Sequence, residues 1–201
     1  MSALPKTKLT PAEYLEIERK AAFRSEFYDG EMFAMAGASR EHNAVKSNLE
    51  GELFLRFKGS PCHTTSSDQR ILVAPSGLYT YPDIAIICGE DEYAIHDRDT
   101  LVNPTIIVEV LSDSTEKYDR TTKLSMYQKI ESLKEYIMVA QDRPWCERIA
   151  RGDDGTWTRT VFAELTGELA FASLPVKIPL ADIYARVAFP EFAPPATGRR
   201  I

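Results

Sequence analysis

Two apolar runs, YPDIAIIC at residues 81–88 and PTIIVEVLS at residues 104–112, decide which fold this sequence can form. Each run has the length and composition of a strand that is buried on both faces. Each also carries one carboxylate, Asp83 at the start of the first run and Glu109 inside the second. Because a buried carboxylate needs a charge partner or a metal ion, these two residues are the first candidates for a functional site.

The segments on either side of these runs predict helices packed against a mixed sheet. Helices are expected over residues 11–22, 40–58 and 119–130, and further strands over residues 68–73 and 135–140, while residues 174–184 are expected to close the fold. Glycine-containing turns predict β-hairpins over residues 25–35 and 146–162, and the charged segment 89–103 is interpreted as a surface connection. The expected fold class is α/β, with a mixed central sheet, flanking helices and added N- and C-terminal β-hairpins.

Length and charge limit the possible organisation. The chain has 201 residues and a mass of 22.6 kDa, which suits a single domain, expected over residues 1–189. Residues 190–201 are expected to form a flexible, proline-rich tail. The net charge of −6 argues against a protein that coats nucleic acid by bulk charge, although it leaves a local basic groove open.

The cysteines and the hydropathy of the sequence argue against disulfide-rich, zinc-binding, secreted and membrane-spanning proteins. The odd number of cysteines (Cys62, Cys88 and Cys146) and the absence of a CxxC pair predict neither a disulfide framework nor a zinc site. The N-terminal residues include no apolar signal segment, and no apolar run approaches the length of a membrane span. We therefore expect a cytoplasmic location and no membrane association.

The periodicities of strand and helix bring a third charged residue toward the two carboxylates. Strand residues two apart share a face, so Glu109 lies with Ile107 and Leu111. On the helix expected over residues 119–130, Lys123 shares a buried stripe with Tyr127. Two carboxylates from neighbouring strands form an oxygen site suited to Mg²⁺ or Mn²⁺, and an ammonium nearby would stabilise charge on a phosphate.

Each of these residues also has a purely structural interpretation. A Pro-Asp pair is a common turn, so Asp83 alone is weak evidence. Glu109 alone could form a structural ion pair, and Lys123 alone could extend to solvent. The three residues in this order, on these elements, together favour a metal site.

A set of short motifs in a fixed order gives the chain a family resemblance. The motifs are YDGE (28–31), MAG (35–37), Ser39 with His42, SDQR (67–70), YTYPD (79–83), IVEVLS (107–112), ST (114–115), YDR (118–120) with Lys123 and Tyr127, EY (135–136), QD (141–142) and PL (179–180). Over nearly its whole length the chain resembles the PD-(D/E)XK nuclease superfamily, and more narrowly the Uma-two family of restriction-type endonucleases. The resemblance implies a restriction-endonuclease-like fold.

The resemblance also implies an activity and roles for residues. It implies a Mg²⁺-dependent (or Mn²⁺-dependent) endonuclease that hydrolyses phosphodiester bonds in DNA, with Asp83 and Glu109 as metal ligands. In the superfamily the catalytic lysine normally lies two residues after the acid, where this chain has Leu111. In the Uma-two branch the lysine lies on the following helix, and Lys123 occupies that position.

Other residues are expected around this centre. Gln141, Asp68 and His42 are candidates for contacts to the metal ligands or the substrate, although His42 could equally be a hydrogen bonder at a helix start. Glu26 and Glu31, which flank the first hairpin turn, are expected near the mouth of the site.

The sequence leaves alternatives open for the oligomeric state, the catalytic function and the substrate. A homodimer is expected from superfamily analogy alone, because cutting both strands often uses two sites. The acidic net charge and Leu111 leave open a non-catalytic nucleic-acid or protein-binding module on a nuclease scaffold. RNA, or a phosphodiester other than DNA, is a third possible substrate.

Overall fold

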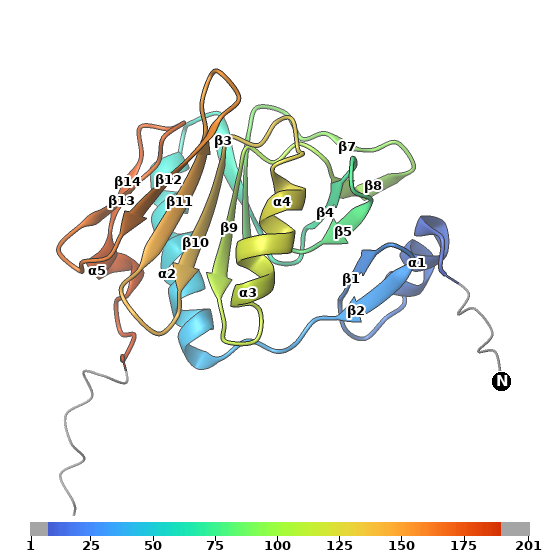
Figure 1. Ribbon diagram of the computed structural model, residues 1–201, viewed down its shortest axis with the longest axis horizontal. Coiled ribbons are helices and arrows are strands. Elements are labelled where there is room, and N and C mark those ends of the chain that lie inside the picture. The colour runs from blue at the N-terminus through green and yellow to red at the C-terminus, as the bar shows by residue number, and fades with distance from the viewer. Residues whose placement is uncertain (1–7, 190–201) are drawn as a thin grey trace, which may run out of the picture.

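A computed structural model describes residues 8–189 of the chain (Figure 1). The predicted proline-rich tail, residues 190–201, lies outside the described residues. The helical segments are α1 (Pro11–Glu18), α2 (Arg40–Phe57), α3 (Glu116–Tyr118), η1 (Asp119–Lys123), α4 (Leu124–Tyr127) and α5 (Leu180–Ile183), and η1 is a π-helical turn. In this part of the chain, no helix has the length and apolar character needed to cross a membrane.

The central sheet has six strands in the order β12-β11-β10-β9-β6-β3. Its strands are β3 (Cys62–Ser66), β6 (Ile84–Cys88), β9 (Ile106–Leu111), β10 (Glu135–Ala140), β11 (Cys146–Arg151) and β12 (Trp157–Phe162). Strands β9 and β10 are parallel and the other neighbours are antiparallel, so the sheet is mixed, as predicted. The two runs that carry the candidate carboxylates, β6 and β9, are neighbours at its centre.

Both faces of the central sheet are covered, which explains the continuous apolar runs. On one face, residues of β6, β9 and β10 pack against α5 and against the stripe of α2 formed by Val45, Leu49, Leu53 and Phe57. On the other face, Ile107 and Leu111 of β9 pack with Tyr127 and with strands of a second sheet. Figure 1 shows α2 behind the central strands and the α3–α4 segment in front of them.

The second sheet has the strand order β2-β1-β5-β4-β8-β7. Its strands are β1 (Ser25–Tyr28), β2 (Glu31–Ala34), β4 (Arg70–Val73), β5 (Leu78–Thr80), β7 (Tyr93–Ala94) and β8 (Asp97–Leu101). The β1–β2 hairpin turns at Asp29 and Gly30, whose φ angles of 48° and 80° match the primed turn that an Asp-Gly pair predicts. Helix α1 covers one face of this hairpin, where the rings of Tyr14 and Phe27 stack at 4.8 Å.

Several sequence-based boundaries are wrong. Segment 89–103, predicted as a surface connection, forms β7 and β8 because its polar Asp97 is buried against Arg70 (2.8 Å). Helix α1 ends at Glu18 rather than at residue 22, since the Glu18 carboxylate accepts hydrogen bonds from Ser25 N–H and Tyr81 OH and holds the chain in a tight return. Strands β13 (Glu168–Ala170) and β14 (Lys177–Pro179) pair with each other. The sequence does not predict β3, β5 or β13, because these strands are too polar or too short to give a clear signal.

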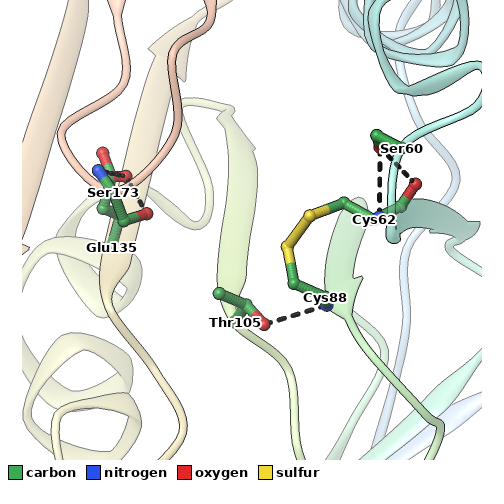
Figure 2. Close-up of a disulfide and its surroundings, with 6 residues drawn as sticks. All are labelled: Ser60, Cys62, Cys88, Thr105, Glu135 and Ser173. Atoms are coloured by element: carbon green, nitrogen blue, oxygen red, sulfur yellow. Dashed lines mark hydrogen bonds between the residues drawn. A yellow bond between two sulfur atoms is a disulfide. The ribbon is translucent and has the colours of Figure 1, made fainter.

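The expectation of no disulfide is also wrong. Cys62 and Cys88 face each other across the antiparallel pair β3–β6, with their Cα atoms 4.0 Å apart, and form a disulfide. Figure 2 shows the bond between hydroxyls of Ser60 and Thr105, which accept hydrogen bonds from the N–H groups of Cys62 and Cys88 respectively (both 3.1 Å). Strand β3 gives no clear sequence signal, so this register could not be predicted. Cys146 is free and buried.

We expect Cys88→Ser to lower the free energy of unfolding by about 3 kcal/mol in non-reducing buffer, because the bond closes a loop in the unfolded chain. The two cysteines are 26 residues apart. Chemical denaturation of the wild type and the variant measures the difference. Dithiothreitol should destabilise the wild type by a similar amount and leave the variant unchanged. Equal stability of the two proteins without reductant would show that the bond does not form.

Candidate active site

A cleft of about 1240 Å³ brings the predicted site residues together. It is lined by one face of the β1–β2 hairpin, the start of α2, and the segments around β6, β9 and η1. Of the residues predicted from the sequence, Asp83, Glu109, Lys123, Gln141, Asp68, His42 and Glu26 line this cleft. Glu31 is not among the lining residues.

Asp83 is fixed by contacts from two other elements. It directly precedes β6, and its Oδ1 lies 2.9 Å from Nε2 of His42 in the first turn of α2. Its Oδ2 accepts a hydrogen bond from the backbone N–H of Val110 in β9 (2.8 Å). The carboxylate is therefore held in one orientation between α2 and β9.

Glu109 is more deeply buried, with an exposed fraction of 5%. Its Oε1 accepts hydrogen bonds from the Lys123 ammonium (2.8 Å) and from Tyr127 OH (2.9 Å). Its Oε2 accepts from the backbone N–H of Asp83 (3.2 Å). Glu109 thus links the two carboxylate-bearing strands to the helix above them, on the face that the strand periodicity predicts.

Lys123 reaches the site from the π-helical turn η1. Besides Glu109, its ammonium lies 3.1 Å from Glu26 of β1 and 3.7 Å from Asp119 at the start of the same turn. A π-helical turn fits one extra residue into the helix and often occurs at functional sites. The sequence predicts a regular helix here and assigns no role to Asp119, because nothing in its pattern marks the wider turn.

The cluster has more acidic than basic groups. Three carboxyl groups, from Glu26, Glu109 and Asp119, surround the single ammonium of Lys123, and the backbone N–H of Asp83 bonds to Glu109. Burial is the main cause that raises the pKa of Glu109 to about 8; the Lys123 ammonium opposes this rise, and the charges of Asp83 and Asp119 add to it. Burial alone would lower the pKa of Lys123, but Glu109 and the other anions outweigh it and raise that pKa, so the lysine stays protonated.

The donor chemistry of this cluster suits a hard divalent cation. Carboxylate oxygens are the ligands that Mg²⁺ and Mn²⁺ prefer, and the surplus of acidic groups favours a bound cation. Within residues 8–189, no group of three or more His, Cys, Asp or Glu side chains has the arrangement of a complete metal cage. Mg²⁺ is commonly held by one or two carboxylates while water and substrate phosphates supply the other ligands.

The remaining predicted residues occupy the rim. Gln141, which follows β10, accepts a hydrogen bond from the hydroxyl of Ser39 (2.8 Å), and Ser39 caps α2 by accepting from the N–H of His42. Asp68 is exposed and forms an ion pair with Arg24. Glu31 is exposed opposite Tyr28, next to the hairpin turn, and the cleft-facing position of this hairpin belongs to Glu26 instead.

Comparisons with known proteins identify the family of this chain and test its fold. Residues 11–181 match the family Uma2, whose description is "Putative restriction endonuclease". The chain belongs to the Uma2 family. The family resemblance inferred from the short motifs is therefore confirmed.

Two other proteins and one solved structure are similar to this Uma2 chain. Uncharacterized protein sll1609 of Synechocystis sp. is 36% identical over 162 residues, which are 81% of this chain and 90% of that protein. Uncharacterized protein slr1290 of the same organism is 30% identical over 185 residues, 92% of this chain and 96% of that protein. A crystal structure of "a putative nuclease belonging to DUF820" from Anabaena variabilis has a TM-score of 0.71 and 15% identity, covering 89% of this chain and 98% of that one, and confirms the fold.

The buried carboxyl of Glu109 predicts a pH dependence of stability in the presence of EDTA. Its pKa of about 8 in the folded protein is above its ordinary value of 4.5, so the folded state binds more protons between these two values. This contribution to stability is complete below pH 4.5 and is lost as pH rises through 8. Glu109→Gln has no carboxyl to titrate, so its free energy of unfolding should fall less steeply than that of the wild type across this window. Urea titrations at several pH values measure both slopes, and parallel slopes would contradict the assignment.

Proposed function

We propose that this Uma2 protein is a Mg²⁺-dependent endonuclease that hydrolyses phosphodiester bonds in DNA. The observation that carries the proposal is the contact of 2.8 Å between the Lys123 ammonium and the Glu109 carboxylate, beside Asp83 and inside a cleft. A metal-dependent phosphodiesterase needs these three groups at one point: two oxygen ligands and one cation.

Asp83 and Glu109 would hold the metal ion in this proposal. When bound, such an ion polarises the scissile phosphate and lowers the pKa of a water molecule. His42 and the N–H of Val110 orient Asp83, and the hydroxyl of Tyr127 orients Glu109. His42 and Tyr127 are therefore positioning residues, because they act through the carboxylates.

Lys123 would stabilise the negative charge that develops on the phosphoryl oxygens. Its side chain is buried, and its ammonium is kept protonated by Glu109 and the other carboxylates around it. A fixed cation in a site that largely excludes water stabilises charge more strongly than a mobile lysine in solvent. Leu111, at the position where the superfamily usually has its lysine, packs in the apolar cluster beneath this helix.

Cleavage of DNA tests the proposal directly. With Mg²⁺, the wild type should nick supercoiled plasmid, and Glu109→Gln and Lys123→Ala should each lower the rate by at least about 100-fold, as for removal of a key electrostatic contact. Lys129→Ala, which changes an exposed lysine close to the same helix, is the matched control and should keep the wild-type rate. Circular dichroism checks that each variant folds. Equal nicking by all four proteins, or nicking in EDTA, would refute the site.

Metal binding gives a second, independent test. Isothermal calorimetry should detect Mn²⁺ binding to the wild type and none to Asp83→Asn. Because the metal competes with a proton on Glu109, the affinity should rise by up to about tenfold per pH unit between pH 6 and 8. Absence of binding at every pH would instead support the non-catalytic module.

A further inference from the structure

The β1–β2 hairpin presents two different faces, and only one of them belongs to a core. Phe27 of β1 is buried against α1, and its cross-strand partner Met32 packs with it. Glu26 and its cross-strand partner Phe33 occupy the opposite face, since neighbouring residues on a strand alternate. Both Glu26 and Phe33 line the cleft.

Two phenylalanines are exposed on this wall of the cleft. Phe33 is 49% exposed, and Phe23, which comes shortly before β1, is 65% exposed. Phe33 lies directly across from Glu26, whose carboxylate is 3.1 Å from the Lys123 ammonium. The exposed ring of Phe33 therefore lines the same cleft as the proposed catalytic lysine, on the strand pair whose Glu26 contacts that lysine.

The charge of the cleft limits how a nucleic acid could bind there. Its lining includes eight acidic residues (Glu18, Glu26, Asp68, Asp83, Asp99, Glu109, Asp113 and Asp119) and only four Lys or Arg residues (Arg24, Lys46, Arg70 and Lys123). Of these cations, Arg24 pairs with Asp68, and Arg70 is buried against Asp97. Duplex DNA is held mainly by many cationic contacts to its phosphates, and this lining offers few of them.

We propose that Phe33 and Phe23 stack on unpaired bases beside the scissile phosphate, so that the substrate class is single-stranded or locally unpaired nucleic acid rather than continuous duplex. The inference rests on the proposed function, because it takes the cleft to hold a phosphodiester at Lys123. Stacking on aromatic side chains adds affinity for each stacked base, and a base offers its flat face only when it is unpaired. Stacked bases would also cover two apolar rings that are otherwise exposed to solvent.

Binding of labelled oligonucleotides tests this inference. Fluorescence anisotropy compares a fluorescein-labelled oligo-dT strand with a labelled hairpin duplex, both with Ca²⁺ in place of Mg²⁺. The wild type should bind the single strand at least about tenfold more tightly, and Phe33→Ala should lose about tenfold in affinity, the usual effect of removing one stacking partner. Phe33→Trp should retain the affinity. Phe54→Ala is the matched control, because Phe54 is 67% exposed on α2 and does not line the cleft.

The outcomes separate this inference from the proposed function. Equal affinity for duplex and single strand, or full affinity in both Phe33→Ala and Phe23→Ala, would overturn the stacking site. So would conversion of a dimer to a monomer by these substitutions in light scattering, since the rings would then form an interface between copies. Stacking-dependent binding without any cleavage in Mg²⁺ would refute the hydrolysis and support the stacking site. Nicking of duplex that is unaffected by Phe33→Ala would do the reverse.

Discussion

The contact between Lys123 and Glu109 is the constraint on which this structure depends. Both groups are buried, and each would be costly to bury without the other. The contact is possible only because the helix that carries Lys123 lies across the central sheet, directly above β9. The hairpin on the far side of the cleft adds Glu26 to the same ammonium. The ion pair thus joins the central sheet, the covering helix and the N-terminal hairpin at one point.

Much of this centre could be predicted because it follows from short-range periodicity. The alternation of residues in β9 determines which way Glu109 points, and the helical stripe through Lys123 and Tyr127 determines which side of the helix faces the sheet. The continuous apolar character of β6, β9 and β10 correctly indicated a sheet covered on both faces. In each case the signal lies within about seven residues of the side chain concerned.

Features that depend on contacts between distant segments could not be predicted. Whether Glu26 or Glu31 reaches the cleft depends on how the hairpin docks, and both residues fit the sequence pattern equally well. The polar strand β8 is stabilised by the contact of its Asp97 with Arg70 of the neighbouring strand β4. The disulfide requires β3 to be aligned with β6, and β3 is a short segment with little apolar character. The π-helical turn could not be predicted either, because the spacing of apolar residues in this segment is that of a regular helix.

The placement of Lys123 on a helix has a consequence for how related chains are compared. Chemistry requires an ammonium at a point in space, and it does not require that the ammonium come from a given position in the chain. Lys123 reaches Glu109 from the helix, and position 111 holds a leucine that packs the sheet against that helix. A motif defined by the number of residues between the acid and the lysine would miss this protein. A motif defined by the spatial positions of the charged groups would include it. Relatives should therefore be compared by the geometry of their charged groups.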